Sequence, residues 1–85
     1  MITQNIKTKL ENELAPEYLN VIDESAGHAS HYAQAASGET HFLIEISASS
    51  LDHLSTLQKH KRIYTILEDE IKKIHAISIR FRKAP

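Results

Sequence analysis

The 85-residue sequence contains no cysteine and no tryptophan, and it has only two glycines and two prolines. Without cysteine the chain forms no disulfide, offers no thiolate nucleophile and cannot hold a metal cluster with its own thiolates, so soft-metal chemistry would need sulfur from another molecule. The glycines, Gly27 and Gly38, make neither a phosphate-binding glycine loop nor a GxSxG motif. Catalysis lacks its usual signatures, and we expect no enzyme.

Long apolar runs and a strong net charge are also missing. The formal net charge is -1 with six neutral histidines, which does not suit a protein that coats polyanions, although protonation of several histidines near about pH 6 would make the chain cationic. No signal-peptide-like segment begins the chain, and none approaches a membrane span. We expect one cytoplasmic domain over residues 1–85, monomeric by itself, that buries roughly 60% of its unfolded surface.

Apolar spacing predicts the first half of the fold. One helical stripe consists of Ile6, Leu10 and Leu14. It predicts a helix over residues 3–15, with Thr3 as N-cap and Pro16 as its end. Residues 17–24 are rich in aromatic and β-branched side chains and predict a strand, and residues 25–39 predict an exposed loop.

Residues 40–47 alternate between apolar and mixed positions, which predicts a strand whose core face carries Phe42, Ile44 and Ile46. A short helical turn is expected over 48–54, and a long helix over 56–73 that begins with a capping box of Ser55 and Gln58. The apolar stripe of the long helix is predicted to comprise Leu57, Tyr64, Leu67, Ile71 and Ile74.

Residues 75–82 alternate again and predict the last strand, with Ile77, Ile79 and Phe81 on the face that His75 shares. The order αββααβ predicts an α+β fold with a three-stranded mixed sheet. Because the last crossover is helical, the second and third strands should run parallel. The helices should cover one face of the sheet and leave the other partly open.

The histidines admit two interpretations. His75 lies at the first position of the last strand, where it is either a structural residue with satisfied ring nitrogens or a ligand or acid–base group. His28 and His31 are three residues apart and could hold a divalent metal, or be solvated loop residues. His41 and His53 have no companion pattern, and we expect both at the surface or rim.

Four potentially cationic residues open the long helix, namely Lys59, His60, Lys61 and Arg62. A short helix followed by a basic second helix is the layout of a helix-turn-helix, although a solvated basic face explains the same pattern. A second positive stripe is expected on the last strand, from Arg80, Arg82 and Lys83. By contrast, the carboxylates of "IDES", residues 22–25, are neighbours on a strand and point to opposite faces, so they cannot act as a catalytic pair.

The segments "VIDESAGH", "ETHFLIEIS" and "LQKHKRIYTILEDEIKKIHAISI" together resemble the BolA family over about residues 18–79. The resemblance implies a K-homology-like αββααβ domain that lacks GXXG. It also implies a partner, a monothiol glutaredoxin, with which members share a [2Fe-2S] cluster held by a glutaredoxin cysteine, by glutathione and by the histidine of a "VHAL"-like motif. That motif reads "IHAI" here, so the implied ligand is His75.

A second ligand is implied from the loop, at the position matched by His28, with His31 as the alternative. As the alternative, the resemblance implies a DNA-binding transcriptional regulator that uses Lys59, His60, Lys61 and Arg62. The family's "RHR" reads "KHK" at residues 59–61, which keeps the charge but loses the planar fork of arginine. The loop after His28 is longer than in many relatives, and "SLDHLSTL" replaces the family's "FxG".

Overall fold

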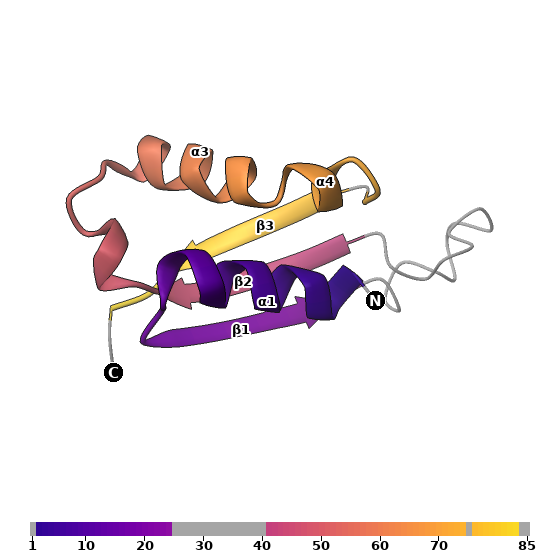
Figure 1. Ribbon diagram of the computed structural model, residues 1–85, viewed down its shortest axis with the longest axis horizontal. Helices are drawn as coiled ribbons and strands as arrows, with labels where there is room; N and C mark the ends of the chain where they lie inside the picture. The colour runs from indigo at the N-terminus through magenta and orange to yellow at the C-terminus, as the bar shows by residue number, and fades with distance from the viewer. Residues whose placement is uncertain (1, 25–40, 75, 84–85) are drawn as a thin grey trace.

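The computed structural model describes residues 2–24, 41–74 and 76–83 (Figure 1). Its elements are, in chain order, α1 (Ile2–Leu14), β1 (Tyr18–Asp23), β2 (His41–Ser47), the short 3-10 helix η1 (Ser49–Leu51), α3 (Thr56–Ile66), α4 (Glu68–Ile71) and β3 (Ala76–Phe81). The predicted αββααβ order and α+β class are confirmed. The loop predicted over 25–39 lies outside the described residues. Among the described helices, none has the length and apolar character needed to cross a bilayer.

The sheet has the strand order β1-β2-β3. β1 pairs antiparallel with β2, and β3 pairs parallel with β2, as the helical crossover predicts. The parallel register aligns Phe42 with Ile77 and Ile46 with Phe81. The last strand-to-strand bond runs from the backbone N–H of Arg82 to the carbonyl oxygen of Ile46, at 2.8 Å.

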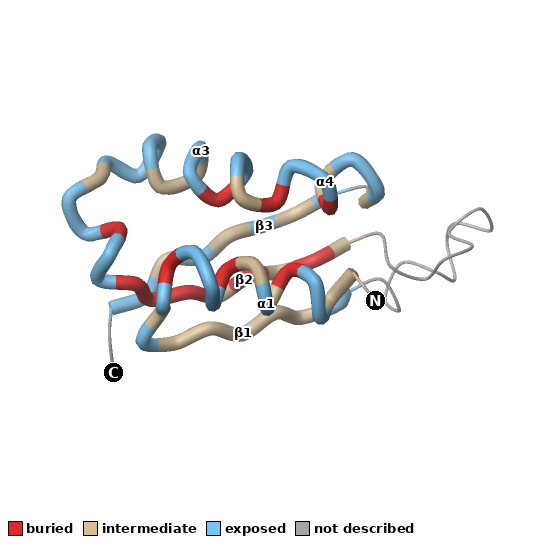
Figure 2. The backbone as a smooth tube through the Cα atoms, viewed as in Figure 1, coloured by how far each residue is buried: buried red, intermediate tan, exposed pale blue. Residues whose placement is uncertain are grey.

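The core lies between one face of the sheet and the helices. Its buried residues are Ile6, Leu10, Leu14, Phe42, Ile44, Ile46, Ala48, Leu51, Ile63 and Leu67. The predicted stripe of α1 is therefore confirmed, and so is the alternation of β2. Figure 2 shows buried positions along β2 and on the turns of α3 and α4 nearest the sheet. Burial of apolar side chains on this side of the sheet supplies the main stabilisation.

The other face of the sheet is more exposed and partly polar. On it, the Nδ2 of Asn20 donates to Oε1 of Glu45 at 3.4 Å, and Arg80 reaches the same carboxylate at 4.0 Å. The guanidinium of Arg82 lies over the ring of Tyr18, 4.9 Å from its centroid. The prediction of a partly open face is therefore confirmed. On this face, polar side chains contact one another across the three strands.

The ends of α1 differ from the prediction. The helix begins at Ile2, so Thr3 lies inside it and the predicted N-cap is wrong. It ends at Leu14, because Ala15 adopts a left-handed conformation with φ of 44° while its N–H still donates to the carbonyl of Glu11 at 3.1 Å. Such a residue satisfies a terminal carbonyl and turns the chain away, and Pro16 then prevents the helix from continuing.

The prediction of one continuous helix over 56–73 is wrong, because the structure has two helices in this segment. The capping box is present: the Ser55 hydroxyl accepts from the Gln58 N–H at 3.2 Å, and the Gln58 side chain accepts from the Ser55 N–H at 2.9 Å. However, Leu67 has φ of -99° and ψ of 19°, outside the helical range, and divides the segment into α3 and α4. Leu67 is fully buried, and no glycine or proline marks this position in the sequence.

The apolar stripe predicted for this helix is also partly wrong. Leu57 is 64% exposed and Tyr64 is 44% exposed, whereas Ile63 and Leu67 are fully buried. The inward face follows Ile63 and Leu67 at a spacing of four, and it places Leu57 and Tyr64 toward solvent. Glu70 continues this inward face, since it is only 5% exposed.

Candidate functional site

The three histidines expected as metal ligands, His75, His28 and His31, lie outside the described residues. The positions that flank them are described. The Glu24 N–H donates to the carbonyl oxygen of His41 at 2.8 Å, so the chain enters and leaves residues 25–40 at one end of the sheet. His41 is in turn aligned with Ala76, the residue that follows His75. The described ends of both segments therefore meet at the same end of the sheet (Figure 1).

Two residues of the basic cluster turn toward β3. Lys59 places its Nζ 5.4 Å from the centroid of the Phe81 ring. The His60 ring meets Phe81 edge-on at 5.0 Å, and its Nδ1 lies 2.9 Å from the carbonyl oxygen of Thr56. Both side chains are half-buried. They occupy positions one turn before Ile63, on the side of α3 that faces the sheet.

The other two residues of the cluster point elsewhere. Lys61 is exposed, and Arg62 approaches the carboxylate of Glu13 on α1 at 3.9 Å. Successive helical residues are rotated by about 100°, so four consecutive positions cannot share one face. The structure thus divides the predicted nucleic-acid surface into an inward pair, an exposed lysine and an arginine turned toward α1.

A shallow hollow of about 300 Å³ lies where β3 ends and α3 begins. Lys59, Arg82 and Lys83 are among its lining residues, and Glu17 is another. The positive stripe expected on the last strand is therefore separated: Arg80 pairs with Glu45, whereas Arg82 and Lys83 join Lys59 at this hollow.

Glu17 is tied to the start of η1. Its carboxylate accepts the Ser49 N–H at 2.6 Å and the Ser49 hydroxyl at 2.9 Å. These two hydrogen bonds, first the one from the backbone, lower the pKa of Glu17 below its ordinary value of 4.5. Glu17 therefore holds its charge while both carboxylate oxygens are engaged.

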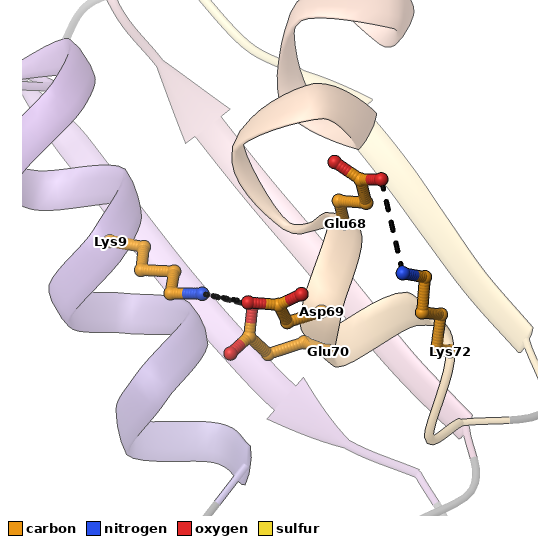
Figure 3. A network of polar contacts seen from close by, with 5 residues as sticks. All are labelled: Lys9, Glu68, Asp69, Glu70 and Lys72. Carbon is orange, nitrogen blue, oxygen red and sulfur yellow. Dashed lines mark hydrogen bonds and ion pairs between the residues drawn. The ribbon is translucent and has the colours of Figure 1, made fainter.

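A second polar cluster joins α1 to α4 (Figure 3). Lys9 donates to Oε1 of Glu70 at 2.8 Å, and Asp69 lies 3.9 Å from the same ammonium. The hydrogen bond to Glu70 raises the pKa of Lys9 above its ordinary value of 10.5, although desolvation opposes the rise. Glu68 and Lys72 form a separate, exposed pair at 3.9 Å.

Sequence reasoning found the basic residues but missed their aromatic partners and Glu70. Tyr18 and Arg82 are far apart in the chain, and so are Lys59 and Phe81. Strand pairing brings Arg82 to Tyr18, and the packing of α3 on the sheet brings Lys59 to Phe81. His53 is exposed and His41 is half-buried, as expected for surface or rim residues. Within residues 2–24, 41–74 and 76–83, no three His, Asp or Glu side chains form a group able to hold a metal ion.

Comparison with known proteins gives the chain its family. A family model of BolA-like proteins matches residues 10–84. The SufE-like protein 1, chloroplastic/mitochondrial, of Arabidopsis thaliana is 43% identical over 79 residues, which are 87% of this chain and 21% of that protein. BolA-like protein 1 of Pongo abelii is 40% identical over 78 residues, 91% of this chain and 54% of that protein. The chain thus spans about a fifth and about half of these two relatives.

A bacterial relative and a solved structure support the same family. The DNA-binding transcriptional regulator BolA of Haemophilus influenzae is 32% identical over 79 residues, covering 92% of this chain and 73% of that protein. The solved BolA domain of SufE1 from Arabidopsis thaliana has a TM-score of 0.80 at 39% identity, over 95% of this chain and 90% of that one. From the matched family model and these relatives, we conclude that the chain belongs to the BolA family.

Proposed function

We propose that this chain is a non-enzymatic partner of a monothiol glutaredoxin and shares a [2Fe-2S] cluster with it, acting in iron–sulfur assembly, transfer or iron and redox regulation. The chain supplies imidazole: His75 is the principal ligand, and His28 the second, with His31 as the alternative. The glutaredoxin and glutathione supply the thiolates. We further propose that it works in the cytoplasm and is monomeric without its partner.

The composition of the chain supports a shared cluster. Fe–S clusters are ordinarily held by thiolates, and histidine replaces cysteine on one iron in some of them. This sequence has six histidines and no cysteine. A cluster that used its histidines would therefore need every thiolate from another molecule, as the proposal states.

The observation that carries the proposal is the meeting of two chain segments at one end of the sheet. Glu24 is bonded to His41, and His41 is aligned with Ala76. Residues 25–40 begin and end there, and His75 is covalently joined to Ala76. This arrangement supports ligation by one histidine from each segment, because their anchoring points are close in space.

The test is reconstitution with a monothiol glutaredoxin, glutathione, iron and sulfide under anaerobic conditions, followed by visible absorption and circular dichroism. A spectrum distinct from that of glutaredoxin alone should form with the wild type. His75→Ala should abolish it, and His28→Ala or His31→Ala should alter it. His53→Ala is the matched control, since His53 is exposed in the turn after η1. Formation of the wild-type spectrum by His75→Ala would overturn the assignment.

DNA binding is the second candidate, supported by the name of the Haemophilus influenzae relative. Lys61 is the exposed cation of the basic cluster, and Arg62 is 46% exposed at its side chain. If the chain binds duplex DNA, Lys61→Gln and Arg62→Gln should each weaken DNA binding. Each should also reduce the magnitude of the slope of log K against log salt by about one, because each lost phosphate contact means that one counterion fewer is released from the DNA. Lys72→Gln is the control, and equal effects of all three would contradict a site on α3.

A further inference from the structure

The outer edge of β3 carries backbone groups without partners. β3 is the last strand in the order β1-β2-β3, so β2 covers only one of its edges, where the Arg82 N–H donates to Ile46. Backbone groups alternate in direction along a strand, so those of Ile77, Ile79 and Phe81 point away from β2. In the part of the chain that the structure describes, the N–H groups of these three residues find no acceptor.

Two exposed apolar side chains of α3 lie on the same side as this edge. Arg62 approaches Glu13, so its side of α3 faces α1. Tyr64 follows Arg62 by two residues, about 200° further around the helix, and lies on the side turned away from α1. Leu57 shares that side, because it is seven residues before Tyr64. Since α1 packs on β1 and α3 runs alongside β3, this side of α3 borders the free edge (Figure 1).

The His60 ring joins Tyr64 to β3. It meets the Phe81 ring edge-on at 5.0 Å and the Tyr64 ring at 6.4 Å. Leu57 and Tyr64 are 64% and 44% exposed, and they are the exposed large apolar side chains of the described residues. An unpaired edge beside exposed apolar side chains suits an extended segment, whose backbone pairs with the edge while alternate side chains find apolar neighbours.

The charged side chains of α3 and β3 are all basic. α3 contains Lys59, His60, Lys61 and Arg62, β3 contains Arg80, and neither contains a carboxylate. Lys61 is exposed on the stripe between Leu57 and Tyr64. Arg80 is 71% exposed at its side chain, and its contact with Glu45 is 4.0 Å long. An acidic segment would therefore meet cations, and no like charge, on the two elements that border the edge.

We propose that the free edge of β3 binds an extended acidic segment of a partner protein as a fourth strand. The segment's apolar side chains lie on the core side of the sheet, against Leu57 and Tyr64, and its acidic side chains alternate with them on the open face, beside Arg80. A second copy of this chain fits less well, because it would bring two sets of Arg80, Arg82 and Lys83 to one seam. This inference does not rest on the glutaredoxin proposal.

The first test follows amide hydrogen exchange of the full chain by NMR, with and without a capped peptide of about nine residues in which valine and glutamate alternate. At saturation, exchange should slow at least about ten-fold at Ile77, Ile79 and Phe81, whose N–H groups gain acceptors. It should change by less than about two-fold at Ser78 and Arg80, whose N–H groups already face β2. Equal slowing of both sets would contradict strand addition.

Peptide variants test backbone pairing and charge separately. In a pairing of either direction, the N–H groups of only one alternate set of peptide residues point toward β3. Methylation of those nitrogens should abolish binding, and methylation of the other set should preserve it, so equal effects of the two sets would refute the proposal. Lysine in place of every glutamate should weaken binding at least about ten-fold. Equal binding of the basic peptide would refute an acidic partner.

Variants of the chain locate the site. Leu57→Ser and Tyr64→Ser, at exposed positions, should leave the far-ultraviolet circular dichroism unchanged and weaken peptide binding about five-fold each. Arg80→Gln should weaken it about three-fold, whereas Lys7→Gln, which removes the same charge from α1, should change it by less than about 1.5-fold. Equal losses in Arg80→Gln and Lys7→Gln would show nonspecific attraction and remove the case for this edge.

A final arm separates the other occupants. Slow exchange at Ile77, Ile79 and Phe81 that appears without peptide and increases with protein concentration would identify a second copy of the chain on the edge. A single-stranded oligonucleotide offers phosphates but no peptide groups for a strand ladder, so it should leave these three amides unchanged. Slowing by the oligonucleotide equal to that by the peptide would identify a nucleic-acid site. Either result would overturn the proposal.

Discussion

Glu70 joins two helices through a part-buried contact with Lys9. Glu70 is 5% exposed and accepts a hydrogen bond at 2.8 Å from Lys9, whose side chain is 37% exposed. Lys9→Met would leave Glu70 buried without this donor, and an unsatisfied buried acceptor costs about 1–3 kcal/mol. We expect Lys9→Met to lower the free energy of unfolding by an amount of this order, measured by urea denaturation.

Two comparisons test the origin of that loss. Lys72→Met breaks a pair in which both side chains are about 70% exposed, and it should change the free energy of unfolding by less than about 0.5 kcal/mol. The double variant Lys9→Met with Glu70→Met removes the buried charge as well and should recover much of the loss. Similar effects of Lys9→Met and Lys72→Met would show that burial of Glu70 is unimportant.

Ionisation of Glu17 contributes to the dependence of stability on pH in the acid range. Its pKa is lowered from 4.5 by the backbone N–H and then the hydroxyl of Ser49. The stabilisation is therefore present above about pH 4.5 and is lost as the pH falls through the lowered pKa. Ser49→Ala removes only the hydroxyl bond, so we expect the pKa of Glu17 to rise part of the way, measured from its carboxyl carbon by NMR. Ser50→Ala, whose hydroxyl bonds Leu14 instead, should leave it unchanged.

Among the elements, strands were predicted better than helix ends. The alternation in β2 and β3 follows directly from side chains that point to opposite faces, and the parallel pairing follows from the helical crossover. The break at Leu67 has no local signal, because a fully buried leucine is also a good helix former. The exposed Leu57 and the buried Glu70 likewise depend on how α3 and α4 sit on α1 and the sheet, which periodicity alone does not define.

The end of α1 supports a prediction about backbone conformation. Ala15 has φ of 44°, a region where its Cβ costs about 1 kcal/mol and glycine pays no such cost. We expect Ala15→Gly to raise the free energy of unfolding by about 0.5 kcal/mol, net of the greater freedom of glycine in the unfolded chain. Ala76→Gly, on an extended strand, should lower it. Thermal denaturation of both variants tests whether the two changes in the free energy of unfolding have opposite signs.

For the whole molecule, sequence reasoning identified the family and the kinds of side chain but not their grouping. The four basic residues at 59–62 separate in space because a helix rotates them. Lys59 instead contacts Phe81 on β3, a contact that depends on how α3 packs on the sheet. The assignment of His75 and His28 stays a prediction.

The proposed cluster makes the complex with glutaredoxin sensitive to pH. Iron binds neutral imidazole, and an ordinary histidine titrates near about pH 6.5. Protonation competes with iron, so the visible circular dichroism of the shared cluster should weaken as the pH falls from about 8 toward 6. The His28→Ala complex should keep only the part of this dependence that protonation of His75 causes. A spectrum that is constant down to about pH 5.5 would contradict histidine ligation.

Folding of this domain during translation can be completed only after β3 has been made. β2 can pair with β1 as soon as both have been made, but its second edge is covered only when residues 76–82 arrive, after α3 and α4. Until then one edge of β2, the strand that carries Phe42, Ile44 and Ile46, has no partner strand. Unpaired strand edges pair readily with other chains. β3, the parallel partner that completes the core, therefore also protects this edge of β2 against aggregation.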